Sequence, residues 1–442
     1  MTVDTIAVWW RGMRSSESLQ YRLARGTAWT IVGTVMQQLC AVLASIGAAR
    51  ILGKIGFGEL GITRSTMATF GVLAGSGLGL ATTRYVAELR TANPARAGTI
   101  IGLFFRVAAI SSGAGSLLCI LASQPLAKHA LHAPALAWPL ALSGLLVLFN
   151  TIGGVQLGVL TGLESFRLAA FAIAFDGCAT ASGILLGARY AAVIGAIAGS
   201  VIASALSMLL RQWLMSTECR RASLAIGRGG FRTELPILWS FIVPSILLGV
   251  STQPFEWLGR VLLTRQPNGL AEVGVLTAAY SWGQIVLFIP TQVTGPALPI
   301  LTNILGMRNM SAFRRLLRHT LLLAIASGVA TALVMVLASK WIMRAYGKEF
   351  VQGWLILSIF AGAYAIASLS SVFRAALLAS GHAWVQNGQA LIWGAALLLA
   401  FLALRELGSL GLAAAYAIAF GVVVVTQSLE TLKAVRNIER SA

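Results

Sequence analysis

Charged residues are scarce in this chain. They make up 11% of its 442 residues, and 57% are hydrophobic, whereas an ordinary soluble domain carries about 25% charged residues. The four cysteines show neither CxxC spacing nor a pairing pattern, and they stand at Cys40, Cys119, Cys178 and Cys219. These deficits exclude a soluble globular protein, a disordered chain and a disulfide-stabilised secreted chain, so the sequence predicts an integral membrane protein.

Acidic residues are rarer than basic ones. The chain has 14 Asp and Glu against 33 Lys and Arg, which gives a formal net charge of +19. In a soluble chain such an excess would suggest nucleic acid as the partner. Here the basic residues lie in short segments between long apolar runs, as the positive-inside rule expects, and none of these segments carries the interleaved aromatic residues of a nucleic-acid groove. We therefore expect no nucleic-acid partner.

Signals of catalysis, metal binding and ATP use are also missing. The four histidines lie in expected loops or at expected helix ends, without a metal-binding arrangement of carboxylates or cysteines around them. The sequence contains no phosphate-binding P-loop, and its N-terminus lacks the apolar core and cleavage site of a removable signal peptide. We expect a protein that is not an enzyme, binds no metal or cofactor, and is not driven by its own ATP hydrolysis.

Long apolar runs dominate the rest of the chain. About twelve of them are long enough to cross a membrane, because a spanning helix needs roughly 20 mainly apolar residues. The sequence therefore predicts an all-α polytopic membrane protein. The expected spans are residues 27–49, 60–82, 98–122, 136–160, 168–188, 191–213, 237–258, 272–300, 316–338, 351–379, 383–404 and 409–429.

The distribution of Lys and Arg predicts the orientation. They are about twice as frequent on the side of the expected termini as on the other side, so both termini of this multi-pass membrane protein should be cytoplasmic. The longest basic connection, Arg211 to Arg232, lies mid-chain and divides the spans into two sets of six. The expected parts are an N-terminal arm (1–26), a first lobe (27–213), a basic linker (214–236), a second lobe (237–430) and a cytoplasmic tail (431–442).

The two halves resemble each other at an offset of about 210 to 219 residues, which indicates a duplication. Because each half has an even number of spans, both halves insert with the same orientation, and the pseudo-two-fold axis runs along the membrane normal. This geometry suits a transporter with its site between two pseudo-symmetric six-helix lobes. The matching pairs are 50–52 and 59–62 with 260–262 and 272–275, 121–123 with 337–339, 160–162 with 379–381, and 195–198 with 411–414.

Two segments of the first half, Ala49 to Gly61 and Gly77 to Glu88, carry ILG, FGELG and GLG…RYVAE pieces. Their spacing resembles the opening of bacterial polysaccharide flippases, in the multidrug/oligosaccharidyl-lipid/polysaccharide exporter superfamily. The resemblance implies a central cavity and movement of a lipid-linked oligosaccharide from the cytoplasmic to the periplasmic leaflet. Its implied partners are the lipid-linked glycan, membrane lipids, and polysaccharide polymerase and chain-length proteins. One departure is that Gly259, rather than an acidic residue, precedes Arg260 in the seventh span.

Charges inside the spans are candidates for the mechanism, because each costs about 2.5–3.5 kcal/mol at the bilayer centre and should face a wet cavity or a partner. Arg106 and Asp176 lie at matching depth in the first lobe, and either form a structural pair or act in ion coupling or headgroup binding. Arg64 is expected near the periplasmic start of the second span and Glu256 near the periplasmic end of the seventh. We expect them to form an outer gate, with unrelated interfacial charges as the alternative.

Arginines are also the candidates for binding a phosphate headgroup. Arg50 and Arg260 are related by the repeat, and together with Arg64 they could engage a polyprenyl diphosphate, because guanidinium groups bind phosphate bidentately. The alternative is that they reach for the membrane interface, which is also what we expect of Arg374 near the cytoplasmic end of the tenth span. Asp176 and Glu256 are the acidic candidates for proton or cation coupling.

These features predict a flippase for a lipid-linked oligosaccharide that works by alternating access and is driven by an ion gradient or the membrane potential. A multidrug and toxin extrusion antiporter for organic cations is the alternative in the same superfamily, although the spans hold more arginine than acid. A membrane glycosyltransferase or polymerase ranks last. It would need positioned catalytic residues, usually on a large extramembrane loop, and the longest expected loop is the basic linker.

Overall fold

The computed structural model describes residues 19–75, 77–227, 234, 247, 249–294, 297–307, 309–380 and 385–441, and all regular structure in them is helical. Helices form because apolar segments shielded from water must satisfy their backbone groups internally. The first half contains α2 (Leu19–Gly75), α3 (Leu78–Ala92), α4 (Pro94–Pro125), α5 (Ala137–Gly162) and α6 (Phe166–Arg221). The second half contains α8 (Gln253–Thr264), α9 (Gly269–Thr294), α10 (Ala297–Gly306), α11 (Met310–Tyr346), α12 (Trp354–Ala379), α13 (Val385–Ala403) and α14 (Gly408–Ser441).

Two of these helices are hairpins that each hold two expected spans. In α2 the chain reverses at Gly53, whose φ of 67° lies in the left-handed region that glycine tolerates. In α6 it reverses at Ala191 and Ala192, and the two arms meet where a Cβ added at Gly187 would overlap the backbone carbonyl of Gly195. Among the described residues, nine helical stretches are long and apolar enough to cross a membrane. Because the stretches in α2 and α6 each reverse and cross twice, the number of membrane passes is larger than nine.

Several boundaries differ from the expected ones. The second arm of α2 begins directly after Gly53, so the second span starts about six residues earlier than expected. The last described helix of the seventh span, α8, continues to Thr264, and residues 237–246 and 248 of that span lie outside the described residues. Helix α6 continues to Arg221, with Arg220 and Arg221 in its last turn, where basic side chains interact favourably with the helix dipole. The first part of the expected linker is therefore helical, and α14 likewise runs through most of the expected tail.

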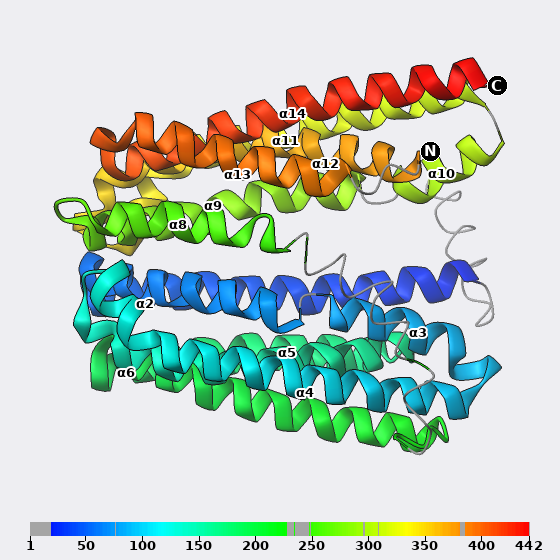
Figure 1. The fold of residues 1–442 in the computed structure, drawn as a ribbon, viewed down its shortest axis with the longest axis horizontal. Helices are drawn as coiled ribbons and strands as arrows, with labels where there is room; N and C mark the ends of the chain where they lie inside the picture. The colour runs from blue at the N-terminus through cyan, green and yellow to red at the C-terminus, as the bar shows by residue number, and fades with distance from the viewer. Residues whose placement is uncertain are drawn as a thin grey trace, which may run out of the picture.

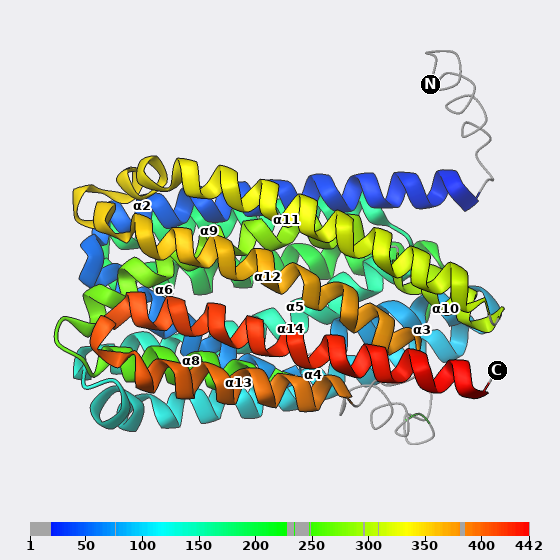
Figure 2. The ribbon, with the colours of Figure 1, turned by 90° about the horizontal axis from the view of Figure 1, so that it is seen from above.

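The helices gather into two lobes. Helices α2 to α6 form one and α8 to α14 the other, and all run roughly along one long axis (Figures 1 and 2). The lobes lie close together at the end where α2 reverses and α8 turns into α9. They diverge toward the end where α2 begins and α14 finishes, on the right in Figure 1. We call the first of these the closed end and the second the open end.

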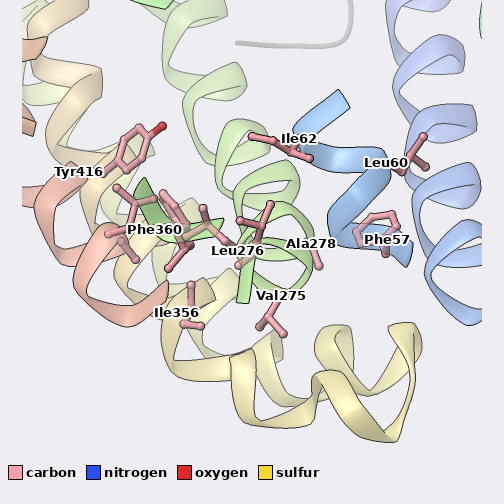
Figure 3. Close-up of a cluster of buried hydrophobic side chains, with 14 of the residues drawn as sticks. Phe57, Leu60, Ile62, Val275, Leu276, Ala278, Ile356, Phe360 and Tyr416 are labelled. Carbon is pink, nitrogen blue, oxygen red and sulfur yellow. The ribbon is translucent and has the colours of Figure 1, made fainter. Parts of the chain in front are cut away.

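The hydrophobic core crosses from one lobe to the other at the closed end. Phe57 and Leu60 of α2 belong to the same buried cluster as Leu276 of α9 and Phe360 of α12 (Figure 3). The ring of Phe57 also lies 6.1 Å from that of Tyr346 at the end of α11, in an edge-to-face arrangement that aromatic pairs favour. Burial of these side chains therefore joins the two lobes at the closed end.

Glycines let α2 and α9 approach backbone to backbone at this point. A Cβ added at Gly58 would overlap the carbonyl of Leu270, and a Cβ added at Gly274 would overlap the carbonyl of Lys54. Small residues at such crossings give membrane helices their closest packing. The two glycines therefore set the distance between the lobes at the closed end.

We expect Gly58→Ala to separate α2 from α9, because overpacking of a tight contact costs about 1–3 kcal/mol. Spin labels at Arg189 and Lys348, in a cysteine-free background, would report the separation of the lobes at the closed end. The matched control is Gly71→Ala, since an added Cβ at Gly71 meets nothing within 4 Å. A longer label distance in Gly58→Ala alone is the expected result, and equal distances in the two variants would contradict it.

Candidate functional site

A cavity of about 350 Å³ lies between the lobes. Helix α2 forms one wall and α9 forms the other, so that both lobes contribute to it. The lining combines amides, hydroxyls and one arginine with a few apolar side chains. Its residues are Gln38, Ala41, Val42, Ser45, Phe57, Leu60, Gly61 and Arg64 of α2 with Thr277, Tyr280, Ser281 and Gln284 of α9.

A second cavity, of about 290 Å³, lies inside the lobe formed by α8 to α14. It is rich in amide and aromatic side chains and shares Tyr280 and Gln284 with the cavity between the lobes. These two residues of α9 thus form the boundary between the two cavities. The lining consists of Thr252, Glu256, Tyr280, Gln284, Leu287, Tyr364, Ser370, Arg374, Gln386, Gln389, Ala390, Trp393, Phe420, Val423 and Gln427.

Two arginines face these cavities. Arg64 lines the cavity between the lobes and Arg374 lines the second one, and both residues are exposed. Neither is joined by an ion pair to any carboxylate in the described part of the chain. Arg374 was expected to reach for the interface, but it lies one turn from Ser370 on the face of α12 that lines the cavity.

Arg64 and Glu256 both lie deeper than expected. Because α2 resumes directly after Gly53, Arg64 is about 16 Å from that end of the helix at 1.5 Å per residue. Because α8 continues to Thr264, Glu256 is about 12 Å from its end. The two residues therefore belong to the interior of the bundle rather than to its rim.

The carboxylate of Glu256 is held by a chain of hydrogen bonds. Tyr280 OH donates to Glu256 Oε2 at 3.1 Å, and Gln284 Nε2 donates to Tyr280 OH at 2.8 Å. On the Tyr280 ring, the Arg260 guanidinium carbon lies 4.6 Å from the ring centroid, which is within cation–π range. Glu256, Tyr280 and Arg260 thus form one connected polar group inside the α8–α14 lobe, in which Arg260 is buried and the other two residues are half-buried.

The expected gate pair is not an ion pair in this conformation. No salt bridge between Arg64 and Glu256 is found among the described residues, since Glu256 is engaged by Tyr280. At this height the lobes are joined instead by a hydrogen bond between residues close to Glu256 and Arg64 in the sequence. Trp257 Nε1 donates a hydrogen bond to Thr66 Oγ1 at 2.9 Å.

Tyr346 is the centre of a second bridge between the lobes. Its hydroxyl accepts from Trp282 Nε1 at 3.0 Å and lies 3.1 Å from Ser45 Oγ on α2. Its ring packs against Phe57 and Phe350. This residue is fully buried, so the bridge is shielded from water at the closed end.

Two arginines complete the closed end, each binding backbone carbonyls of the opposite lobe. Arg50 Nε donates to the carbonyl of Ala345 at 2.7 Å, at the end of α11. Arg265 donates to the carbonyls of Ala130 and His129 at 3.1 and 3.2 Å, in the π-helical turn η1 (Leu126–Ala130) that follows α4. Cations are favourable at such helix C-termini.

These contacts revise the expected relation between Arg50 and Arg260. The sequence offset paired them, but the structure places Arg50 on the exposed rim and buries Arg260 beneath Tyr280. Arg265 occupies the position in its lobe that corresponds to Arg50, because it follows the seventh span and reaches across to the other lobe. The sequence reasoning did not single out Arg265 as a site residue.

Asp176 lies beside a different arginine from the one expected. Asp176 Oδ1 is 3.6 Å from Arg211 Nη2, and Gln37 Nε2 donates to Asp176 Oδ2 at 3.4 Å. Arg211 is buried within α6, although the sequence analysis counted it as the first residue of the basic connection between the lobes. Arg106 is exposed, one turn beyond Gly102 on the face of α4 that meets Gly227.

The described residues contain no group of three or more His, Cys, Asp or Glu side chains that could hold a metal ion. The polar groups that they do contain are arginines, amides, hydroxyls and single carboxylates. Two bundles of membrane-length helices around a polar central cavity define the class, which is a two-lobed membrane transporter fold.

Solved structures share this fold. The inward-facing conformation of a multidrug resistance MATE family transporter of the MOP superfamily is 14% identical with a TM-score of 0.79, covering 93% of this chain and 99% of that one. The outward-facing conformation of a multidrug resistance MATE family transporter of the same superfamily is 15% identical with a TM-score of 0.66, covering 95% and 97%. The expected all-α fold with two lobes is thereby confirmed.

The chain belongs to the polysaccharide biosynthesis protein family, which matches residues 23–305. The EPS I polysaccharide export inner membrane protein EpsE of Ralstonia solanacearum is 25% identical over 211 residues, covering 46% of this chain and 48% of the relative. The protein of the same description from Ralstonia nicotianae is 24% identical over 187 residues, covering 40% and 42%. The chain spans about half the length of the curated relatives it matches. The family expected from the sequence is confirmed.

We expect the double variant Arg50→Ala, Arg265→Ala to loosen the closed end, because it removes the side-chain bonds to the carbonyls of Ala345, Ala130 and His129. Each exposed bond of this kind contributes about 0.5–1.5 kcal/mol. Hydrogen–deuterium exchange should rise several-fold in peptides covering 126–136 and 344–353. Arg344→Ala, an exposed arginine at the same end, is the matched control, and similar exchange in both variants would refute the role of the two arginines.

We expect Arg211→Met to destabilise the first lobe by about 3 kcal/mol, because removing one partner of a buried ion pair leaves the other charge uncompensated. Thermal melting in detergent should fall by several degrees, whereas Arg189→Met, on an exposed side chain of the same helix, should change it little. Adding Asp176→Asn to Arg211→Met should recover part of the loss. Equal melting of the Arg211 and Arg189 variants would show that the pair with Asp176 is unimportant for stability.

Proposed function

We propose that this chain is a polysaccharide export protein of the inner membrane that flips a lipid-linked oligosaccharide by alternating access. The observation that carries the proposal is a cavity between two lobes that come together at the closed end, with Arg64 and Arg374 facing the cavities and, among the described residues, forming no ion pair with a carboxylate. The family match supports the link to polysaccharide, and so does the export function in the name of the Ralstonia solanacearum relative.

The two arginines favour a phosphate headgroup. Guanidinium groups bind phosphate oxygens bidentately, and they hold their charge inside a protein. The only carboxylate lining either cavity, among the described residues, is that of Glu256, which accepts a hydrogen bond from Tyr280. The balance of charge therefore suits the diphosphate of a polyprenyl-linked glycan. Of the three headgroup candidates expected from the sequence, Arg64 is the one we favour. Arg50 binds the carbonyl of Ala345, and Arg260 lies against the ring of Tyr280.

The conformational cycle follows from the position of the contacts. With both termini in the cytoplasm, as the distribution of Lys and Arg favours, the open end faces the cytoplasm and the structure is inward-facing. The higher TM-score with the inward-facing transporter, 0.79 against 0.66, agrees with this assignment. In the outward-facing state, the bonds from Arg50, Arg265 and Trp257 to the opposite lobe would break.

Energy for the cycle would come from an ion gradient or from the membrane potential. Asp176 and Glu256 are the proposed coupling groups, because each is an acid inside one lobe beside an arginine. A proton or cation there would change the charge balance that Arg211 or Arg260 experiences. The polyprenyl tail would stay in the lipid, and polysaccharide polymerase and chain-length proteins are the expected partners of the flipped product.

We expect the double variant Arg64→Ala, Arg374→Ala to slow flipping at least tenfold, because hydrogen bonds to a charged group contribute about 1.5–3 kcal/mol each. The measurement uses liposomes with a fluorescent short-chain polyprenyl-diphosphate glycan and follows exposure of its headgroup to an impermeant reagent. Arg344→Ala is the matched control, because it is exposed and lies away from both cavities.

The outcomes separate the function from the residues. Wild-type rates in the double variant would remove Arg64 and Arg374 from the headgroup site but keep the flippase. If the unmodified protein does not flip the glycan with a proton gradient and a potential imposed, the flippase proposal itself is overturned.

Cation antiport is the second candidate function. The observation that favours it is the setting of Glu256, which lies near the rings of Tyr280, Tyr364 and Tyr416, since aromatic faces attract organic cations. Proton-driven efflux of a fluorescent organic cation from the same liposomes, abolished by Glu256→Gln, would establish this function.

A further inference from the structure

Three side chains of the cavity inside the α8–α14 lobe have polar atoms with no hydrogen-bond partner among the described residues. They are Gln386 Nε2, Trp393 Nε1 and Gln427 Oε1. Trp393 is 7% exposed and Gln427 is 4% exposed, so bulk solvent does not satisfy them. Buried polar groups are nearly always paired, so three orphaned atoms around one cavity indicate a molecule that fits there.

A fourth side chain has its orientation fixed by a neighbour. Thr426 Oγ1 donates to Gln389 Oε1 at 2.6 Å, which occupies the amide oxygen and leaves the amide NH2 group for the cavity that Gln389 lines. The wall thus offers NH donors from Gln386, Gln389 and Trp393 and an acceptor from Gln427. A hydroxyl group matches this set, because it both donates and accepts.

Aromatic rings complete the wall. The ring centroids of Trp393 and Phe420 lie 5.6 Å apart, and those of Tyr364 and Phe420 also lie 5.6 Å apart. All three residues line the cavity, so it presents apolar ring surface beside the amides. A pyranose ring has the same two-sided character, with C–H groups on its faces and hydroxyls around its edge.

The charge and size of the cavity narrow the class of ligand. Its lining holds one carboxylate, Glu256, and one guanidinium, Arg374, and its other polar groups are neutral amides, hydroxyls and an indole, so the wall as a whole favours a neutral ring over a bare cation or a multiply charged anion. Its volume of about 290 Å³ is at the lower end of the range for ligand pockets, so it has room for one sugar ring rather than for an oligosaccharide. Arg374 lies in the same wall, where a phosphate attached to that ring could be bound.

We propose that this cavity is a subsite for one neutral pyranose, which is the sugar attached directly to the diphosphate of the lipid-linked glycan. The lipid linkage rests on the proposed function, whereas binding of the sugar ring itself does not. The subsite would let the α8–α14 lobe select the first sugar while Arg64 and Arg374 bind the diphosphate. Longer glycans would extend into the cavity between the lobes, past Tyr280 and Gln284.

The test is saturation-transfer NMR on the full chain in lipid nanodiscs with a panel of neutral methyl pyranosides, including an N-acetylhexosaminide, and a methyl hexuronide. We expect at least one neutral pyranoside to give a saturable signal. Gln427→Met and Gln389→Met should each weaken its binding about three- to tenfold, the effect of losing one or two hydrogen bonds.

The matched control is Gln156→Met in the other lobe. Gln156 is also buried and also has an unpartnered amide oxygen, but it lines neither cavity. Its variant should bind the pyranoside as the unmodified protein does, and thermal melting would confirm that all three variants fold.

Each outcome decides the proposal. Weaker binding in the two cavity variants alone supports the subsite. No saturable signal from any pyranoside, or equal binding in all variants, overturns it. If the pyranoside binds as expected but the liposomes show no flipping of the lipid-linked glycan, the sugar subsite stands and the flippase function fails.

Discussion

The close contact of α2 with α9 is the constraint on which the rest of the structure depends. Because Gly58 and Gly274 carry no side chains, the two backbones approach until each glycine lies against a carbonyl of the other helix. Every other bond between the lobes is arranged around that contact. Tyr346, Trp257, Arg50 and Arg265 can reach the opposite lobe because the glycines bring it near. The space farther along α2 and α9, where the lobes diverge, becomes the cavity.

The duplication explains why the closing contacts come in related sets. Arg50 ends the first span and binds the end of α11, whereas Arg265 follows the seventh span and binds the turn after α4. A pseudo-two-fold axis along the membrane normal exchanges these two interactions. The interiors of the lobes have diverged by contrast. One holds Asp176 with Arg211, and the other holds Glu256 with Tyr280 and an amide-rich cavity.

The sequence predicted the fold well, because hydropathy reports directly on the need of each span to satisfy its own backbone. It predicted individual partners less well. The second span was expected to start at residue 60 and the seventh to end at 258, and these errors placed Arg64 and Glu256 at the rim. Arg265 was missed because the residues that match 50–52 are 260–262, so the repeat paired Arg50 with Arg260 instead. Arg211 was missed because it begins the basic connection and so looked like an interfacial charge, whereas only the tertiary structure shows that its side chain is buried beside Asp176.

The strength of the closed end sets what can open it. It is held by a handful of neutral or exposed hydrogen bonds, each contributing about 0.5–1.5 kcal/mol, and by a small patch of aromatic packing around Phe57 and Tyr346. A ligand must favour one state by about 5.5 kcal/mol to move a population from 1:99 to 99:1. The free energy needed to break a few weak bonds is comparable with the binding free energy that a ligand can supply. An ion pair buried between the lobes would add a large cost to their separation. Because Arg64 forms no ion pair with any carboxylate in the described part of the chain, its cation is available for an anionic ligand and the lobes stay separable.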